Sequence, residues 1–417
     1  MPVIDVATAP IEMLAQTFHV FDPVHAQWPS TVMNRLLNEC PVAKSQVFEG
    51  GYWVVTKVEH ARRILSDPET FSSSAPIVPR LEGSEMLLSI PLTLDPPDHT
   101  AYRRLLGVVF SPNRIEKMEP QVRELARSAA SALVSGGPVI DFMKGFAIPY
   151  PAATLLKVLG LPIEDLDTLL HFKDLMTVNQ FSPDEAVRED FRCVQIPMIR
   201  DYVVQQADLR RDPDSAPEGL FTALVHTKLR GERLLTDDEL VGIVTLLISA
   251  GLDTTTAHLC MHLAYLAENQ DRWQELIDHP ERIPGAVDEL LRYNSNVNPA
   301  RLIMKDVEIG GIQMKAGEMV SVVLPATSFD ADEFPDPMCL DFERRPNRHL
   351  TFGGGPHTCL GSHLARFLLR IAMQELTAVM PRFRIAPGTT PVRHAGILFG
   401  MDNLELELTG DADEVKP

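Results

Sequence analysis

The cysteine at position 359 lies between a glycine-rich turn and a segment with helical spacing. The turn contains Gly353, Gly354 and Gly355, which permit positive φ angles and close backbone approach. Apolar residues then recur at helical intervals from Leu360 onward. A cysteine at a helix start lies near free N–H groups and the positive end of the helix dipole, which favour a thiolate. Because the thiolate is the form that binds metals, Cys359 could ligate one.

One thiolate with no CxxC partner is too few for a zinc site or an iron–sulfur cluster. Haem iron, in contrast, needs only one axial protein ligand. Taken alone, Cys359 is more often a buried structural cysteine, because free cysteine is among the most buried residue types. The wider pattern Phe352-x-x-Gly355-x-x-x-Cys359-x-Gly361 favours the metal ligand. It resembles the haem-binding signature of the cytochrome P450 family, the haem-thiolate monooxygenases.

The resemblance covers nearly the whole chain and implies a fold and a cofactor. The implied fold is mainly α with a small β region, a triangular helical prism with a long central helix over the haem. The implied cofactor is haem b (iron protoporphyrin IX), with Cys359 as the iron ligand. The turn at Gly355 is then expected to leave backbone N–H groups free for the sulfur, and Phe352 to shield the sulfur from water.

A second motif, Asp95-Pro-Pro-Asp-His-Thr-Ala-Tyr-Arg103, contains a double proline that forms a sharp stop before a helix. His99 and Arg103 then fall four residues apart on one helix face. By themselves they are compatible with an ordinary surface pair. The resemblance implies that both hold a haem propionate, with Arg301 as a second propionate-binding arginine and His357 as a further donor. Arginine suits a carboxylate because its fork can bind both oxygens.

A long helix is predicted from the capping box Thr236-Asp-Asp-Glu239 to about residue 269. Its apolar first half, residues 240–252, is too short to span a membrane, so we expect a core helix. Asp253 and Thr254 interrupt this apolar run, and a buried Asp needs a partner. The segment is compatible with a simple helix kink. It also resembles the family's oxygen-activating motif, which implies that Asp253 and Thr254 deliver protons during the reaction with dioxygen.

The sequence Glu289-Leu-Leu-Arg292 places opposite charges three residues apart on one helix face. Alone this spacing is common and typical of an exposed pair. Its position about 70 residues before the cysteine resembles the family's Glu-x-x-Arg motif, a buried network that anchors the core around the haem. We expect its third member to be Arg345 or His349.

Apolar residues in several segments are candidates for the substrate pocket. They suggest a small lipophilic substrate, such as a terpenoid or norisoprenoid. In the camphor-hydroxylating enzymes that the chain resembles, a tyrosine near position 87 binds a substrate ketone. This sequence has Leu87 there, which argues against recognition of a ketone by a tyrosine hydroxyl. The candidates are Leu87, Leu88, Leu246, Val297 and Ile397.

The length, cysteine content and net charge of the sequence exclude several classes of protein. The 417 residues show no linker or repeat, so we expect a single domain over residues 1–417. Five widely spaced cysteines suggest neither a disulfide framework nor a zinc module and fit a reducing cytoplasm. The N-terminus has no basic segment followed by an apolar run, so we expect neither signal peptide nor membrane anchor. A net charge of −19 argues against nucleic-acid binding.

The implied reaction inserts one oxygen atom of O2 into a C–H bond and reduces the other to water, using two electrons. No flavin or iron–sulfur segment is recognisable in the sequence, so the resemblance implies an iron–sulfur ferredoxin and its flavin reductase as partners of a monomeric enzyme. A local basic patch that includes Arg366 is expected to dock the acidic ferredoxin. Two alternatives remain: a peroxide-driven haem peroxygenase, and a haem protein that only binds or senses a ligand. Asp253 and Thr254 disfavour both, because neither needs a proton relay.

Overall fold

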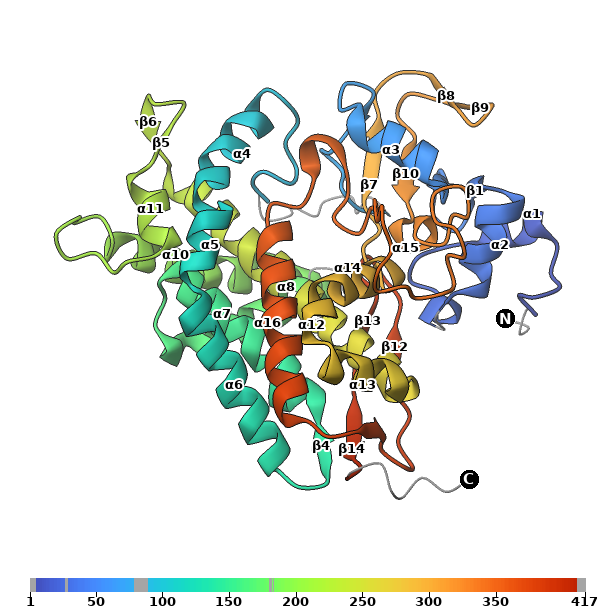
Figure 1. Cartoon of the computed structure of the whole chain (residues 1–417). Helices are drawn as coiled ribbons and strands as arrows, with labels where there is room; N and C mark the ends of the chain where they lie inside the picture. The colour runs from blue at the N-terminus through green and yellow to red at the C-terminus, as the bar shows by residue number, and fades with distance from the viewer. Residues whose placement is uncertain (1–4, 27–28, 79–88, 180–181, 183, 411–417) are drawn as a thin grey trace.

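The structure is a computed structural model that describes residues 5–26, 29–78, 89–179, 182 and 184–410. Its secondary structure is mainly helical with small sheets, as expected (Figure 1). Two of the substrate candidates, Leu87 and Leu88, lie outside the described residues. The helices are α1 Ile11–Thr17, α2 Thr31–Glu39, α3 Val58–Ser66, α4 Asp98–Val109, α5 Pro112–Lys117, α6 Glu119–Ser135, α7 Pro149–Leu159, α8 Leu166–Val178, α9 Glu185–Asp190, α10 Ile196–Asp208, α11 Leu220–His226, α12 Asp237–Glu268, α13 Gln270–Asp278, α14 Ile283–Tyr293, α15 Leu324–Thr327 and α16 Ser362–Val379.

The largest sheet has five strands in the order β1-β2-β10-β7-β3 and lies beside the N-terminal helices (Figure 1). A segment rich in β-branched and aromatic residues forms β2, and α3 follows it. Strand β10 pairs parallel with β2 and antiparallel with β7, which carries Arg301. The strands are β1 Val42–Ser45, β2 Tyr52–Val55, β3 Phe71–Ser72, β4 Val139–Asp141, β5 Lys228–Leu229, β6 Arg233–Leu234, β7 Ala300–Ile303, β8 Val307–Ile309, β9 Ile312–Met314, β10 Met319–Val322, β11 Phe383–Ile385, β12 Arg393–His394, β13 Gly400–Met401 and β14 Glu405–Leu408.

Helix α12 runs through the centre of the molecule for 32 residues, about 48 Å at 1.5 Å per residue. The predicted capping box is present: the Thr236 amide donates to Glu239 Oε2 at 2.7 Å, and the Glu239 amide donates to Thr236 Oγ1 at 3.3 Å. Among the described residues this one helix is long and apolar enough to cross a membrane by length and composition, with 56% of its most apolar window buried inside the protein. The surrounding helices α7, α8 and α10 pack against it, so it is a core helix.

Two hydrophobic clusters meet on α12. The first half of the helix, up to Leu252, belongs to a cluster shared with α7, α8, α10 and α11. The second half, from Ala257, belongs to a cluster shared with α6, α14 and α16. The polar segment 253–256 therefore lies at the boundary between the two clusters, where a carboxylate and hydroxyls displace no core side chain.

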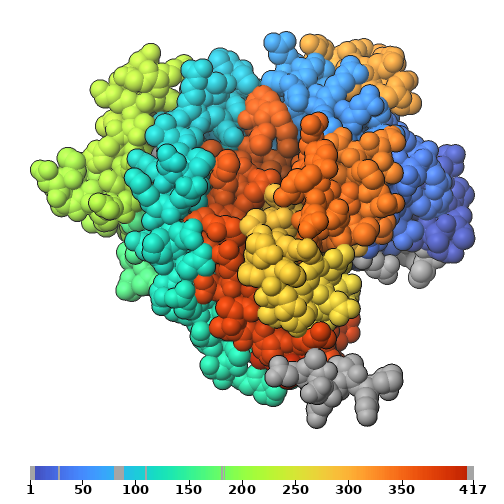
Figure 2. All heavy atoms as spheres, viewed as in Figure 1, coloured from blue at the N-terminus to red at the C-terminus, as the bar shows by residue number. Residues whose placement is uncertain are grey.

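Helix α16 lies on the face shown in Figure 2, flanked by α5 and α6 on one side and by α13 and α14 on the other. The glycine-rich turn and Cys359 lie shortly before its first residue, Ser362. Gly355 has φ +65°, and a Cβ there would lie 2.1 Å from the carbonyl oxygen of Leu65. Only glycine fits this close approach to the end of α3, so the turn is held in one place.

Candidate active site

Cys359 is the centre of the site. Its amide donates to the carbonyl oxygen of Phe352 at 2.8 Å, which closes the turn, and the Gly361 amide donates to its sulfur. The side chain is accessible although protein atoms surround it. Burial raises the pKa of the Cys359 thiol, whereas the Gly361 amide and the guanidinium charges of Arg103 and Arg366 lower it. A cation such as iron would complete the charge balance that favours the thiolate.

The four predicted propionate-binding residues come from three elements and gather around one place. His99 and Arg103 lie on α4, Arg301 on β7, and His357 in the 3₁₀ turn Gly355–His357 before Cys359. The imidazole rings of His99 and His357 lie 4.0 Å apart between centroids. The fold therefore brings these separate segments together, and propionate binding by the four residues stays a prediction.

Several polar atoms of this cluster have no hydrogen-bond partner. Among the described residues, neither ring nitrogen of His99 nor Nε2 of His357 has a hydrogen-bond partner, although all three atoms are buried. Burial and the neighbouring charge of Arg103 lower the pKa of His99 to about 4. Burial lowers the pKa of Arg301 to about 10. Unpaired buried donors cost free energy, so the cluster is suited to an acidic group such as a pair of carboxylates.

These features fit haem b. A single cysteine just before a helix can ligate the iron, and this cluster of two arginines and two histidines can receive two propionates. On α12, Ala250 and Gly251 are exposed although they lie in the middle of a core helix. These two small residues can accommodate the flat face of a macrocycle close to the helix backbone.

Asp253 pairs with a residue that the sequence did not indicate. Its Oδ1 lies 3.0 Å from Nζ of Lys173 on α8, and that ammonium also lies 2.6 Å from Oδ1 of Asp174. The Lys173 side chain is only 17% exposed. Lys173 follows the buried Phe172 in an amphipathic pattern, and no sequence signal linked it to Asp253.

Burial raises the pKa of the Asp253 carboxyl, while the charge and hydrogen bond of Lys173 lower it without fully offsetting that effect. Thr254 donates its hydroxyl to the carbonyl oxygen of Ala250 at 2.7 Å. Thr255 makes the same bond to Gly251 at 3.1 Å, whereas Thr256 reaches the carbonyl oxygen of Ala147 at 2.9 Å. The Asp253 carboxyl has a raised pKa, which suits a group that holds and transfers a proton, and Thr254 follows it on α12.

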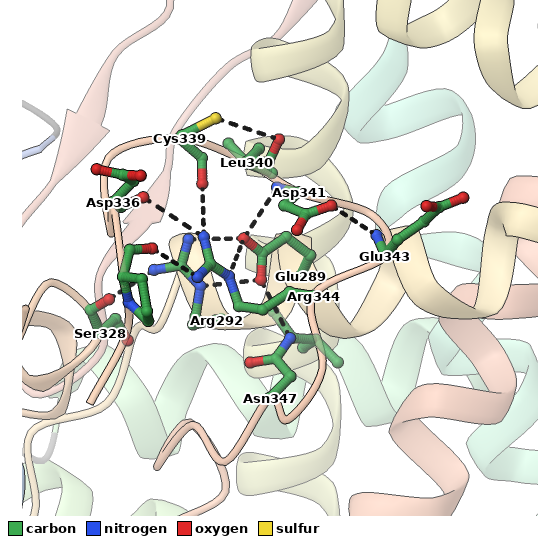
Figure 3. Close-up of polar contacts among 12 residues, drawn as sticks. Glu289, Arg292, Ser328, Asp336, Cys339, Leu340, Asp341, Glu343, Arg344 and Asn347 are labelled. Atoms are coloured by element: carbon green, nitrogen blue, oxygen red, sulfur yellow. Dashed lines mark hydrogen bonds and ion pairs between the residues drawn. The ribbon is translucent and has the colours of Figure 1, made fainter.

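Figure 3 shows the buried network around Glu289 and Arg292. Both side chains are fully buried, and the guanidinium binds the carboxylate through two bonds of 2.9 and 2.8 Å. The Arg292 Nη1 also donates to the carbonyl oxygen of Ser328 at 2.6 Å. The predicted buried Glu-x-x-Arg pair is therefore present.

The predicted third member of this network was wrong. Arg344, not Arg345 or His349, donates from Nε to Glu289 Oε1 at 3.0 Å, and Asn347 donates to Oε2 at 3.1 Å (Figure 3). Arg344 is buried and also donates to the carbonyl oxygens of Pro335 and Cys339. Its neighbour Arg345 is exposed. Successive residues in this irregular segment point in different directions, so sequence position could not separate the two arginines.

The substrate candidates within the described residues come from two regions. Val297 pairs with Leu398 in an isolated antiparallel bridge, and the Asn298 amide donates to the carbonyl oxygen of Ile397 at 2.9 Å. The segments that contain Val297 and Ile397 are therefore neighbours, as the pocket hypothesis requires. Leu246, on α12, is half-buried.

Comparisons with known proteins agree with this geometry. The family model described as Cytochrome P450 matches residues 164–283 and 283–401. Probable cytochrome P450 127A1 of Sinorhizobium fredii is 36% identical over 357 residues, which cover 85% of this chain and 83% of that protein. The vitamin D(3) 25-hydroxylase of Pseudonocardia autotrophica is 30% identical over 375 residues, 88% of this chain and 90% of that protein. The crystal structure of CYP101J2 has a TM-score of 0.84 at 28% identity and covers 94% of this chain and 96% of that one.

Proposed function

The chain belongs to the cytochrome P450 family, and from this premise we propose how its own residues hold the cofactor and what the enzyme oxidises. Family membership makes it a haem b-dependent monooxygenase with a P450 fold. We assign Cys359 as the iron ligand, with Phe352 and Gly355 shaping the turn around its sulfur. The assignment rests on the hydrogen bond from the Gly361 amide to the sulfur and on the placement of Cys359 at the start of α16.

The propionates are assigned to the cluster formed by His99, Arg103, Arg301 and His357. The observation that supports this assignment is that both ring nitrogens of His99 and Nε2 of His357 are buried and have no hydrogen-bond partner among the described residues. Arginine can bind a carboxylate through two parallel bonds, and each histidine can donate one. When bound, haem supplies the oxygen chemistry, and the protein supplies orientation and protons.

Asp253 and Thr254 are assigned to proton delivery. The support is the raised pKa of the Asp253 carboxyl, the adjacent Thr254 hydroxyl and the position of both at the boundary of the two hydrophobic clusters. The Lys173 ammonium favours the ionised carboxylate and partly offsets the effect of burial. A relay of this kind favours a monooxygenase over a ligand sensor, because a sensor consumes no protons.

The substrate is proposed to be small and lipophilic, of terpenoid or norisoprenoid type. Within the described residues the support is the apolar character of Leu246, Val297 and Ile397 and the pairing of the 297 and 397 segments. The vitamin D(3) 25-hydroxylase among its relatives acts, by its name, on a lipophilic molecule. A screen of lipophilic compounds for the Soret shift that accompanies loss of iron-bound water tests this proposal.

The electron donor is proposed to be an iron–sulfur ferredoxin with a flavin reductase, docking on the α16 face shown in Figure 2. A groove of about 230 Å³ is lined by α5, α14 and α16. The groove carries both charge signs, Glu116 and Asp288 together with Arg366 and Arg370, so it is not the simple basic patch expected from the sequence. Cytoplasmic location, a monomer and a single domain over residues 1–417 stay predictions.

The experiment that tests this function compares three conditions with one substrate: NADH with ferredoxin and reductase, peroxide alone, and no reductant. Product in the first condition alone supports the monooxygenase. Product from peroxide at a similar rate favours the peroxygenase, and substrate-induced spectral change without product favours a sensor.

In parallel, Cys359→His should abolish the red-shifted Soret band of the ferrous carbon monoxide complex, and Cys339→Ser should retain it. A Cys359→His protein that keeps this band would show that another residue ligates the iron.

A further inference from the structure

The β5–β6 hairpin lies beside α4, the helix that carries half of the propionate cluster (Figure 1). Two arginines of the hairpin reach other elements. Arg233 donates from Nη1 and Nη2 to the two carboxylate oxygens of Glu239 at 2.8 and 2.7 Å. Arg230 donates from Nη2 to Oδ1 of Asp98, the first residue of α4, at 2.6 Å. The hairpin is therefore bound both to the start of α12 and to the start of α4.

Tyr102 makes a second connection from α4 to the same carboxylate. Its side chain is buried, and its hydroxyl donates to Glu239 Oε1 at 2.5 Å. Glu239 is buried as well, so one carboxylate of α12 receives donors from α4 and from the hairpin. Hydrogen bonds to an ionised acceptor are stronger than those between neutral groups. Glu239 is therefore the fixed point at which α4 is attached to α12.

The spacing of residues on α4 links these contacts to the propionate cluster. Asp98 and Tyr102 are four residues apart and share one face of the helix. His99 and Arg103 each follow one of them and share the adjacent face. Because the hydrogen bonds of the helix keep these two turns rigid, fixing the first face also fixes the axial position and rotation of the second.

The backbone of Arg230 indicates that its side chain has a use. It is one of two non-glycine residues with positive φ in the part of the chain that the structure describes, at +55°. This conformation is costly for an arginine, whereas the following Gly231, at +78°, adopts it freely. The side chain pairs with Asp98, but the two are 49% and 67% exposed, so the pair contributes little to stability. A strained residue in such a pair suits a role in positioning.

We propose that Tyr102, Arg230 and Arg233 are positioning residues that hold α4 where two of its side chains meet the haem propionates; we call them the α4 brace. The inference rests on the proposed propionate site of His99 and Arg103. It makes haem retention depend on residues outside the propionate cluster, which act on that cluster only through α4.

Transfer of haem from the haem-loaded protein to apomyoglobin tests the α4 brace. Tyr102→Phe keeps the ring and removes the donor. It should release haem about three- to tenfold faster, which is part of the roughly tenfold or larger shift that a hydrogen bond to a charged group produces. Arg230→Gln and Asp98→Asn should each speed release about threefold. The double variant should be no faster than either single variant, because both substitutions break one ion pair.

Two matched controls remove the same kinds of contact away from α4. Tyr202→Phe removes a tyrosine–carboxylate hydrogen bond, from the Tyr202 hydroxyl on α10 to Asp165 Oδ2 at 2.6 Å. Arg200→Gln breaks an ion pair of 2.6 Å with Asp238 at the start of α12, between side chains that are 42% and 76% exposed. Both controls should transfer haem at the wild-type rate.

Arg103→Leu separates the α4 brace from the propionate site, and it should speed haem transfer. If it does so while Tyr102→Phe and Arg230→Gln transfer haem at the rates of their controls, the propionate site stands and the α4 brace is overturned. If Arg103→Leu transfers haem at the wild-type rate, both are overturned. Urea unfolding of each haem-loaded variant gives the stability. Equal losses of stability and equal transfer rates for Tyr102→Phe and Tyr202→Phe would show a contribution to folding alone, which also overturns the inference.

Discussion

The Asp253 carboxylate forms an ion pair with the Lys173 ammonium, with 3.0 Å between Oδ1 and Nζ. It therefore does not face only apolar neighbours. Burial favours the protonated carboxyl, and the ammonium favours the carboxylate, so the two forms are balanced against each other. Lys173, which shifts this balance toward the carboxylate, lies on α8, and α8 packs against α12. Movement of α8 would therefore change the proton affinity of Asp253.

Lys173→Met should raise the pKa of the Asp253 carboxyl further, because it removes the cation and leaves the burial. The acidic limb of the pH profile should then move to higher pH, and product per NADH at neutral pH should fall. The decrease should be smaller than for Asp253→Asn, for which we expect about 10²-fold. Lys173→Arg should resemble wild type, as should Lys157→Met at an exposed position of α7. An unchanged pH profile in Lys173→Met would contradict control of Asp253 by this lysine.

Arg301 should contribute strongly to haem retention, because it is 5% exposed and donates within the described residues only to the carbonyl oxygen of Ala300. Losing a charge-assisted hydrogen bond costs about 1.5–3 kcal/mol, so Arg301→Leu should release haem about 10- to 100-fold more readily. Transfer of haem to apomyoglobin measures this release. Arg348→Leu, at an exposed position, serves as the control. Equal transfer rates for both variants would remove Arg301 from the propionate site.

At the scale of elements, the sequence predicted features that depend on local spacing. The start of α12, the strand–helix unit β2–α3 and the helix after Cys359 follow from capping residues and periodicity. Contacts between distant elements could not be predicted in this way. The Lys173–Asp253 pair joins two helices through a pairing that neither sequence pattern encodes.

The network around Glu289 also contains a contact that could not be predicted from the sequence, here within an irregular segment. The resemblance placed Glu289 and Arg292 correctly because a helix fixes their three-residue spacing. The third member lies in a stretch without periodicity, where the direction of each side chain depends on local turns. Arg344 points to Glu289 and its exposed neighbour Arg345 does not, so the choice between them required coordinates.

This difference gives a paired test of the network. Arg344→Met removes one partner of a fully buried carboxylate, which should lower the free energy of unfolding by about 3 kcal/mol. Arg345→Met, at an exposed position, should change it by less than about 0.5 kcal/mol. Urea unfolding of both variants with haem bound gives the comparison. A larger loss for Arg345→Met would restore the assignment expected from the sequence.

At the scale of the whole molecule, the net charge of −19 leaves much of the surface acidic, yet many carboxylates have local cationic partners. Hydrogen bonds with arginines hold the pKa values of Glu119 and Glu333 below their usual range, and Arg123 and Arg127 do the same for Glu375 against its burial. These ion pairs link helices α6 and α16 and attach the segment that contains Glu333 to α3. A folded-state pKa below the unfolded value gives stability that is present above the unfolded pKa and is lost on acidification. We therefore expect the fold to resist alkaline conditions better than acidic ones.

Glu239 is the clearest example of a carboxylate whose pKa is lowered by its partners, and it connects α12 to two other elements. It accepts hydrogen bonds from Tyr102 on α4 and from Arg233 on β6, and the bonds from Arg233 are the main reason that its pKa is lowered to about 2. Its stabilising contribution should be complete above the unfolded pKa of about 4.3 and should disappear as pH falls toward 2. Glu239→Gln should therefore lower the free energy of unfolding by about 1–2 kcal/mol at pH 7, after allowance for solvent screening.

The difference between Glu239→Gln and wild type should shrink steadily when urea unfolding is repeated at pH 4 and pH 3, because the wild-type carboxylate then loses its advantage over a neutral side chain. Glu124→Gln, with a side chain 67% exposed, should show no comparable difference at any of these pH values. The α4 helix that Tyr102 anchors also carries His99 and Arg103, so Glu239→Gln should loosen haem binding in addition. A stability difference that stays constant from pH 7 to pH 3 would show that Glu239 acts through packing and not through its charge.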